Sequence, residues 1–172
     1  KIEDMQKQIV SKIANKFSPE ETKVISFGDS LSTLKKCPDG FAKLIITSPP
    51  YNVGKAYEKV SKLETYLSKI RPMIKELSRV LSKDGSVCWQ VGNYVNKGEV
   101  FPLDIFYYQL FKEEGFQLRN RIVWFFDHGL HSKRRFSGRY EILLWFTKSE
   151  EYTFYLDSVR VKSKYPGKKY CK

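Results

Sequence analysis

The chain has 172 residues, of which 41% are hydrophobic, and it carries a net charge of +12. This size and hydrophobic content suit one domain with one core, and the excess of positive charge indicates a polyanionic partner. Three cysteines without paired spacing, only two histidines and the lack of an apolar run of about 20 residues argue against a disulfide framework, a metal cluster and a membrane span.

The hydrophobic pattern predicts strands that alternate with helices. Residues 42–47 (AKLIIT) form a continuous apolar run, which is typical of a strand buried on both faces. Residues 63–82 repeat apolar side chains at helical spacing, with Pro72 expected to kink the helix. Such alternation predicts an α/β sheet with right-handed crossovers, and consecutive strands near the end of the chain predict an antiparallel edge. The predicted elements in chain order are a helical or loosely ordered lead-in at 1–19, a strand at 24–27, a helix at 31–36, the strand at 42–47, the helix at 63–82, a strand at 86–91, a helix at 101–114, and strands at 117–126, 141–147 and 152–161.

The positive charge is concentrated in the last third of the chain. Residues 128–172 contain 11 Lys and Arg against 4 Asp and Glu. One interpretation is a solvated basic surface. The other is a nucleic-acid interface, which the aromatic content of 15% favours because bases stack on aromatic rings.

A short polar and proline-rich segment follows the buried strand at 42–47. It reads Ser48-Pro49-Pro50-Tyr51 and lies beyond the carboxyl end of that strand, where open α/β sheets bind their ligands. The two prolines fix the backbone and remove two N–H donors, which leaves the local carbonyls available as acceptors. A Pro-Pro-Tyr tripeptide alone is equally compatible with a rigid turn in which Tyr51 only packs.

The segment 47–52 resembles motif IV of the DNA amino-methyltransferases, in which Asp, Asn or Ser precedes Pro-Pro and then Tyr or Phe. Further matches follow the order of that family's beta group: 27–30 (FGDS), 135–148, which is similar to motif VIII, and 159–168, which looks like the start of the target-recognition region. The resemblance spans residues 24–172. It implies a Rossmann-like S-adenosylmethionine-dependent methyltransferase sheet, mostly parallel with an antiparallel edge and incomplete in this chain. Its parts would be a lead-in at 1–20, a partial catalytic domain at 21–150 and the start of the recognition region at 151–172.

The resemblance also implies roles for the motif. Ser48 and the carbonyl of Pro49 would accept the N–H groups of an exocyclic amine, Pro50 would fix the turn, and Tyr51 would stack on a base flipped out of the duplex. A serine before Pro-Pro is more typical of cytosine-N4 enzymes than of adenine-N6 enzymes. Methylation at cytosine carbon 5 is excluded, because that chemistry uses a cysteine after a proline and no such pair occurs.

The same resemblance assigns the cofactor and DNA contacts. Asp29, Ser30 and Ser48 would border S-adenosylmethionine, although Asp29 or, more readily, Ser30 could instead cap the helix at 31–36. The expected partner is double-stranded DNA, in a restriction-modification system of the prokaryotic cytoplasm, and a homodimer is among the assemblies that the family allows. The residues expected to contact DNA are Asn52, Lys55, Lys133, Arg134, Arg135, Arg139, Lys162 and Lys164.

One family motif is missing from the sequence. The family binds its cofactor through a Phe-x-Gly-x-Gly loop, and none of the ten glycines is separated from another by a single residue. We therefore expect a C-terminal segment or a complementary chain to supply that loop. Two alternatives stay open: a catalytically silent DNA-binding half or partner subunit, and an amino-methyltransferase that acts on RNA.

Overall fold

The computed structural model describes residues 23–56, 59–129 and 131–167, which build a four-stranded sheet of order β1-β2-β6-β5. Strand β1 (Ala42–Thr47) pairs in parallel with β2 (Leu81–Val91). Strand β6 (Tyr140–Thr147) pairs antiparallel with β2 and with β5 (Gln117–Phe125). Three strands therefore share one direction and β6 alone opposes them, which confirms the α/β class with a sheet of mixed direction.

The consecutive strands β5 and β6 form an antiparallel edge of the sheet, as the sequence predicts, and the reversed strand β6 takes the inner position. After β5 the chain turns back and inserts β6 between β5 and β2. The physical reason is burial, because the inner position brings Ile142, Leu144 and Phe146 into the core. The edge is left to β5, whose second half is exposed.

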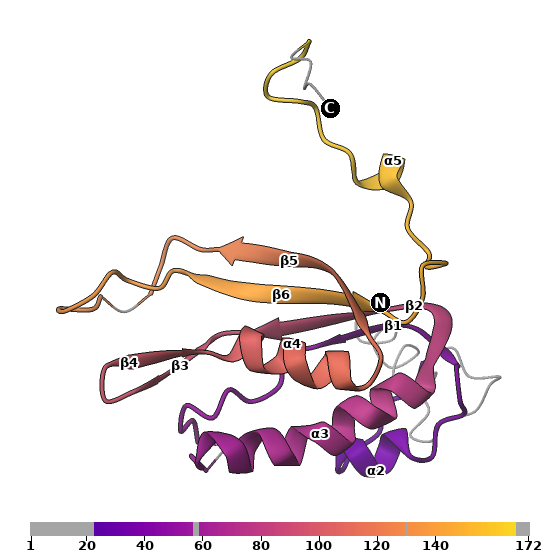
Figure 1. Ribbon diagram of the computed structural model, residues 1–172, viewed down its shortest axis with the longest axis horizontal. Coiled ribbons are helices and arrows are strands. Elements are labelled where there is room, and N and C mark those ends of the chain that lie inside the picture. The colour runs from indigo at the N-terminus through magenta and orange to yellow at the C-terminus, as the bar shows by residue number, and fades with distance from the viewer. Residues whose placement is uncertain (1–22, 57–58, 130, 168–172) are drawn as a thin grey trace, which may run out of the picture.

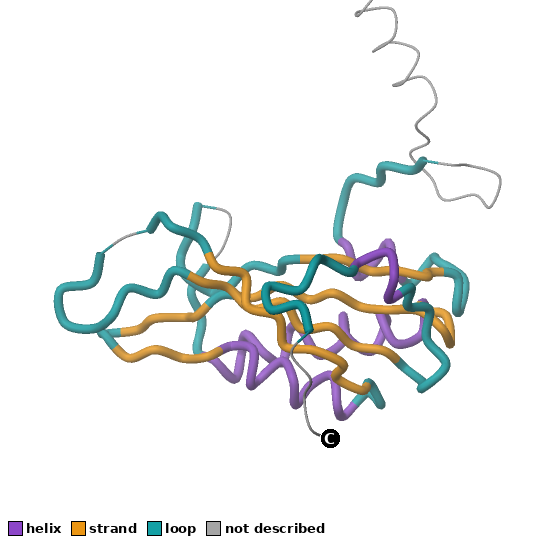
Figure 2. Tube along the Cα trace, turned by 90° about the horizontal axis from the view of Figure 1, so that it is seen from above, coloured by secondary structure: helices purple, strands orange, loops and turns teal. Residues whose placement is uncertain are grey.

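Helices cover one face of this sheet (Figures 1 and 2). Helix α3 (Leu63–Val80) makes the crossover between β1 and β2 and runs through Pro72 without interruption. Helix α2 (Ser30–Leu34) packs beside α3, and α4 (Leu103–Glu113) lies beyond it. The buried face of α3 carries Tyr66, Ile74, Leu77 and Val80.

The core lies between these helices and the sheet. Alternate side chains of β2, namely Val87, Trp89 and Val91, point to the helical side and are almost fully buried. Phe111 of α4 stacks on Phe146 of β6 with ring centroids 4.3 Å apart. Since burying one such apolar side chain stabilises a fold by about 1.5–3 kcal/mol, this layer holds the ends of β1, β2 and β6 in fixed positions.

Some predicted elements differ from those observed. The strand predicted at 24–27 is reduced to a single bridge residue, Val24. In place of the strand predicted at 152–161 there is a one-turn helix, α5 (Leu156–Val159), because no strand lies beside this exposed segment within the described residues. An unpredicted hairpin joins β3 (Asn93–Asn96) to β4 (Glu99–Pro102). Its turn residues Lys97 and Gly98 both have positive φ, as in a type I′ turn.

The helical or loosely ordered lead-in predicted at 1–19 lies outside the described residues. Among the helices that are described, none is both long and apolar enough to cross a lipid bilayer.

Candidate functional site

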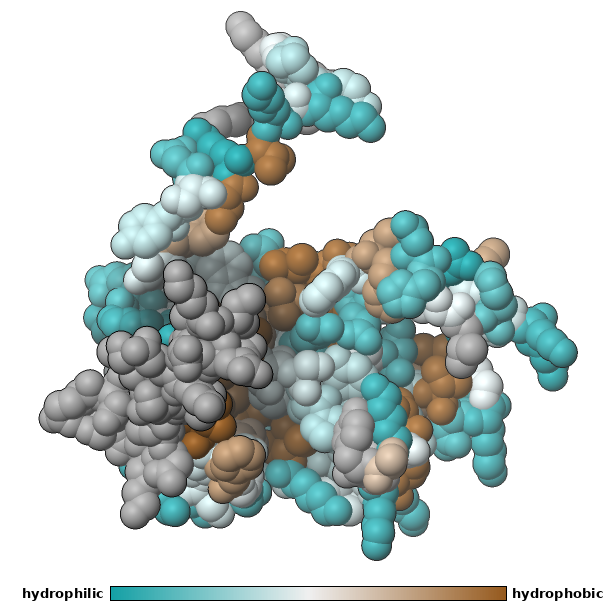
Figure 3. Space-filling model, turned by 180° about the vertical axis from the view of Figure 1, so that it is seen from behind, coloured by the Kyte–Doolittle hydropathy of each residue, from teal (hydrophilic) through white to brown (hydrophobic). Residues whose placement is uncertain are grey.

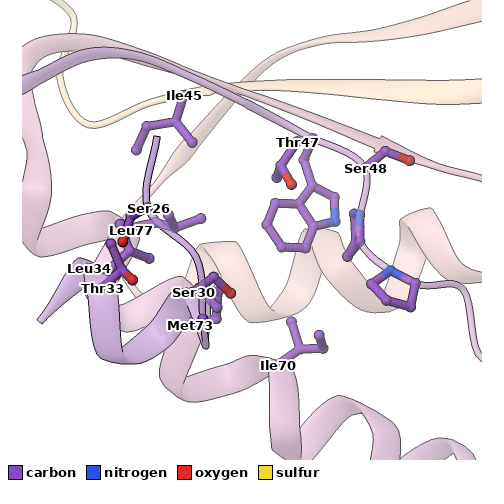
Figure 4. Close-up of a pocket in the computed structure, with 14 residues that line it drawn as sticks. Ser26, Ser30, Thr33, Leu34, Ile45, Thr47, Ser48, Ile70, Met73 and Leu77 are labelled. Atoms are coloured by element: carbon purple, nitrogen blue, oxygen red, sulfur yellow. The ribbon is translucent and has the colours of Figure 1, made fainter. Parts of the chain in front are cut away.

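The Ser-Pro-Pro-Tyr motif leaves the sheet at the carboxyl end of β1. Because β1 and β2 are parallel, their carboxyl ends share one edge of the sheet, and this is where Ser48 and Gly92 lie. Figure 4 shows Thr47 and Ser48 at this edge, above the helices. The hydroxyl of Tyr66 on α3 donates to the carbonyl of Pro50 at 2.5 Å. The motif is thus tied to the helical layer at Pro50, while the carbonyl of Pro49 accepts no hydrogen bond from the described residues.

The first cavity lies on the helical side of the motif and has a volume of about 530 Å³. This volume is typical of a site for a small organic ligand. In Figure 4, α2 contributes hydroxyl groups and α3 contributes an apolar floor. The lining residues are Ser26, Gly28, Ser30, Thr33, Leu34, Ile45, Thr47, Ser48, Pro49, Pro50, Ile70, Met73, Leu77 and Trp89.

Of the three predicted cofactor residues, Ser30 and Ser48 line the first cavity and Asp29 does not. Asp29 is the N-cap of α2, and its Oδ1 accepts from the backbone N–H of Ser32 at 2.8 Å. Hydrogen bonds from Ser32 hold the pKa of Asp29 below its usual value. The capping residue is therefore Asp29, whereas the sequence favours Ser30, because only the side chain that precedes the first helical residue can reach the free N–H groups.

The second cavity has a volume of about 470 Å³, and Tyr51 of the motif is one of its lining residues. It lies between the start of β6, the β3–β4 hairpin and the loop that joins β5 to β6. Its lining residues are Tyr51, Gly92, Asn93, Val95, Val100, Phe126, Arg135, Phe136, Ser137, Gly138, Tyr140 and Glu141. The motif therefore contributes to both cavities, with Ser48 to Pro50 on the first and Tyr51 on the second.

A chain of hydrogen bonds joins the motif to the sheet. The hydroxyl oxygens of Ser48 and Tyr51 are 2.6 Å apart. The Tyr51 hydroxyl donates to Oε2 of Glu141 at 3.1 Å, and the amide of Gln90 donates to the same oxygen at 2.6 Å. Burial, with a smaller contribution from Glu141, raises the pKa of Tyr51 to about 12. The phenol therefore keeps its proton at neutral pH.

Comparison with known proteins places this arrangement in a family. The family model described as DNA methylase, of the N6/N4 type, matches residues 42–172. The type II methyltransferase M.BglII of Bacillus subtilis is 42% identical over 99% of this chain and 48% of its own length. The chain belongs to the N6/N4 DNA methylases. It spans about half the length of the curated relatives that it matches.

Solved structures agree with the fold of this methylase. The cytosine-N4-specific PvuII DNA methyltransferase superposes with a TM-score of 0.63 at 25% identity, over 74% of this chain and 49% of that one. A DNA modification methylase of Thermus thermophilus, solved in complex with S-adenosylmethionine, superposes with a TM-score of 0.60 at 23% identity, over 74% of this chain and 54% of that one.

The residues predicted to contact DNA fall into separate places in the methylase. Lys133, Arg134, Arg135 and Arg139 lie in the loop between β5 and β6, which extends beyond the end of the sheet (Figures 1 and 2). Arg135 lines the second cavity and donates to the carbonyl of Phe136, whose side chain is 99% exposed. The Nε of Arg139 is buried without a hydrogen-bond partner in the described part of the chain.

The remaining predicted contacts are more dispersed. Lys162 and Lys164 are exposed on the tail after α5, which rises away from the sheet as an arm that is mostly hydrophilic toward its end (Figure 3). Lys55 is exposed in the segment that follows the motif. Asn52 does not belong in this group, because it is only 2% exposed and both its amide atoms bond to the backbone of Ser61. Its side chain ties the backbone of Ser61 to that of Asn52, so we do not retain Asn52 in the DNA interface.

Gln90 and Glu141 are site residues that the sequence does not predict. Glu141 lies within the segment that resembles motif VIII, and Gln90 is a polar residue between the buried apolar positions of β2. Those are the only signals in the sequence, and neither shows that Gln90 and Tyr51 both bond to Glu141.

Proposed function

We propose that this protein is an S-adenosylmethionine-dependent DNA methyltransferase of a restriction-modification system, acting on the exocyclic amine of a flipped base, with cytosine N4 as the preferred acceptor. The observation that carries this proposal is the position of Ser48-Pro49-Pro50-Tyr51 between two cavities. One cavity would hold the methyl donor and the other the base, so the motif lies where the methyl group has to pass.

The first cavity suits part of the cofactor. The hydroxyls of Ser26, Ser30 and Thr33 can bond the polar edges of an adenosine, and Met73 and Leu77 offer an apolar surface to its flat faces. Trp89, in the same wall, has an indole N–H without a hydrogen-bond partner among the described residues. S-adenosylmethionine, when bound, supplies a methyl group activated on a sulfonium. No charged side chain is among the described lining residues, so partners for the methionine carboxylate and ammonium would come from elsewhere.

The second cavity suits the acceptor base. Tyr51 would stack on the ring of the base, and such stacking contributes about 1–3 kcal/mol per base to the free energy of binding. Ser48 and the carbonyl of Pro49 would accept the two N–H bonds of the amine. These hydrogen bonds would draw the nitrogen toward a tetrahedral geometry and localise its lone pair. The lone pair would attack the methyl carbon, the carbon–sulfur bond would break to release the thioether S-adenosylhomocysteine, and one N–H proton of the methylated amine would pass to water. The protein acts mainly through positioning, and no covalent intermediate on the protein is needed.

The preference for cytosine N4 rests on two observations. Ser48 stands where the adenine-specific enzymes more often have Asp, and the PvuII enzyme, which superposes over most of this chain, is described as cytosine-N4-specific. The exposed cations near Arg135 and on the tail after α5 would bind phosphates around the flipped base.

The test is the modified nucleoside itself. The full-length natural protein, incubated with duplex DNA and labelled S-adenosylmethionine, should yield N4-methylcytosine when the digested DNA is analysed by mass spectrometry. Ser48→Ala should slow transfer by a factor of about 2 to 10, since one hydrogen bond contributes about 0.5–1.5 kcal/mol and 1.4 kcal/mol corresponds to a factor of ten, while DNA affinity stays unchanged. Ser68→Ala, on the exposed surface of α3, is the matched control and should retain full activity.

Each other outcome has a defined meaning. N6-methyladenine as the product would leave the amine chemistry intact and reverse the choice of base. 5-Methylcytosine, or normal transfer by the Ser48 variant, would contradict the role of the motif. DNA binding without methylation of any base would favour the silent DNA-binding half, and methylation of RNA alone would favour the RNA enzyme.

A further inference from the structure

We propose that Glu141 is a positioning residue that orients the hydroxyl of Ser48, so that Ser48 presents only lone pairs to the amine of the substrate. This inference rests on the proposed function and assigns roles to Glu141 and Gln90 in the same site.

Oε2 of Glu141 is one end of the chain of hydrogen bonds that reaches Ser48. Two groups converge on this oxygen: the amide nitrogen of Gln90 at 2.6 Å and the hydroxyl of Tyr51 at 3.1 Å. An ionised carboxylate can only accept hydrogen bonds. Both neighbours must therefore be donors, and the single proton of the Tyr51 hydroxyl points to Glu141.

The direction of the next hydrogen bond follows from this. Ser48 and Tyr51 lie 2.6 Å apart, and either hydroxyl could donate if the pair were isolated. Since Tyr51 has given its only proton to Glu141, its oxygen must accept, and Ser48 must donate. A serine hydroxyl has one proton and two acceptor lone pairs. With that proton engaged by Tyr51, Ser48 has only lone pairs left for a substrate.

This polarity matters for the reaction. The exocyclic amine has to give its N–H groups to acceptors while its lone pair attacks the methyl carbon. A freely rotating serine hydroxyl could donate its proton to the amine nitrogen and engage the lone pair that the reaction uses. The chain from Glu141 through Tyr51 removes that orientation before the substrate arrives, which is preorganisation of a polar group around the reacting atom.

The positions of Gln90 and Glu141 on the sheet keep this chain of hydrogen bonds in place. Gln90 and Glu141 lie on β2 and β6, and each precedes a residue of the core, Val91 and Ile142. Successive side chains of a strand point to opposite faces, so Gln90 and Glu141 share the face opposite the core. The pKa of Tyr51, which burial and then Glu141 raise to about 12, keeps the phenol protonated at neutral pH.

The test uses three single variants, one double variant and one control variant of the full-length protein. Glu141→Leu removes the acceptor and should lower kcat at least tenfold, with the KM for DNA and for cofactor changed less than threefold. Glu141→Gln keeps a carbonyl oxygen that can still accept from Tyr51 and Gln90, and it should recover most of the rate. Tyr51→Phe removes the hydroxyl in the middle of the same chain of hydrogen bonds. The double variant Tyr51→Phe with Glu141→Leu should therefore be no slower than the slower single variant. Glu113→Gln, on α4 and lining neither cavity, is the control and should match the wild type.

A second readout needs no activity. In protein labelled with ¹³C at tyrosine Cζ, the resonance that disappears in Tyr51→Phe is that of Tyr51. This resonance should give a pKa of about 12 in the wild type and a lower pKa in Glu141→Leu. If the wild type does not methylate DNA, the proposed function fails, while this titration still shows whether Tyr51 is hydrogen-bonded to Glu141. If the wild type methylates DNA, a Glu141→Leu enzyme of normal kcat, an additive loss in the double variant, or a Glu141→Gln enzyme as slow as Glu141→Leu would each overturn the orienting role.

Discussion

Gly92 lies directly against the ring of Tyr51, and a β-carbon at Gly92 would come within 3.1 Å of both Cδ2 and Cε2 of that ring. The backbone of Gly92 has no positive φ, so the glycine is needed here for space and not for its conformation. Gly92→Ala should push the ring by a few tenths of an ångström and slow methyl transfer. A displacement of 1 Å can cost ~100-fold in rate, and we expect a loss of about tenfold for this smaller shift. Steady-state kinetics on duplex DNA measures it.

The matched control for this substitution is Gly138→Ala. Gly138 also lines the second cavity and has no positive φ, but a β-carbon there meets nothing within 4 Å. This variant should transfer methyl groups at the normal rate, and both variants should unfold at the wild-type temperature. Equal rates for the two alanine variants would show that Tyr51 does not need its observed position.

The loop between β5 and β6 should contribute to DNA affinity through phosphate contacts. Lys133 and Arg134 are exposed in it, and neither forms an ion pair with another described residue. Replacing both with alanine should reduce the slope of log affinity against log salt by about two units, one for each lost phosphate contact. Fluorescence anisotropy with a labelled duplex at several salt concentrations gives the slope.

The control for the salt experiment is a pair of lysines on another surface. Lys69 and Lys75 are exposed on α3. Alanine at both positions changes the net charge by the same amount as the loop variant. If both variants lower the slope equally, the effect belongs to the total charge and the loop has no specific place in the interface.

Those parts of the fold that the sequence predicts well carry strong local periodicity. The apolar run at 42–47 and the helical repeat at 63–82 correspond to β1 and α3 within a few residues. The prediction that β1 is buried on both faces is wrong within the described residues, because β1 lies at the edge of the sheet with Leu44 56% and Ile46 68% exposed. The β3–β4 hairpin was missed because its strands have only four residues each and its signal is the single turn at Lys97 and Gly98. The alternation at 152–161 predicts a strand, but a strand forms only where a neighbouring strand supplies hydrogen bonds, and the alternation carries no information about such a neighbour.

The candidate site shows the same division between local and distant information. Ser48 to Tyr51 are adjacent in the chain, so a motif can identify them. Glu141 bonds to Tyr51, which is 90 residues away in the chain, and to Gln90, which is 51 residues away. Only the pairing of β2 with β6 brings these side chains together. Asp29 shows the converse, because its position in the chain suits a helix cap as well as a cofactor contact, and the geometry shows the cap.

Asp84 should make folding stability depend on acid pH. Its carboxylate accepts from Lys43 at 2.7 Å and from Ser82 at 2.9 Å, which joins β1 to β2. The hydrogen bond from Lys43, and then that from Ser82, lower the pKa of Asp84 from 3.8 to about 2. A carboxyl group with a lowered pKa stabilises the folded state above its unfolded pKa, and this contribution is lost as the pH falls through the folded value. The window for the loss therefore runs from 3.8 down to about 2.

Asp84→Asn tests that contribution. The variant should be less stable than the wild type at neutral pH, and the difference should shrink as the pH falls through this window, as measured by urea unfolding. Asp157→Asn, an exposed aspartate on α5, is the control and should follow the wild-type curve. A stability difference that is constant from neutral pH down to the lower end of that window would show that Lys43 does not hold Asp84 in its charged form.

Residues 1–172 by themselves should bind S-adenosylmethionine weakly. The described lining of the first cavity offers hydroxyl groups and apolar side chains but no charged group, whereas the methionine part of the ligand carries both a carboxylate and an ammonium. One hydrogen bond to a charged group contributes about 1.5–3 kcal/mol, and 1.4 kcal/mol corresponds to a factor of ten in affinity. We therefore expect calorimetry to give an affinity at least about tenfold below that of the full-length protein. Circular dichroism and a cooperative thermal transition would establish that residues 1–172 are folded in this comparison. Equal affinity of the two proteins would mean that these residues contain the whole cofactor site, with the charged partners supplied by residues that do not line the first cavity.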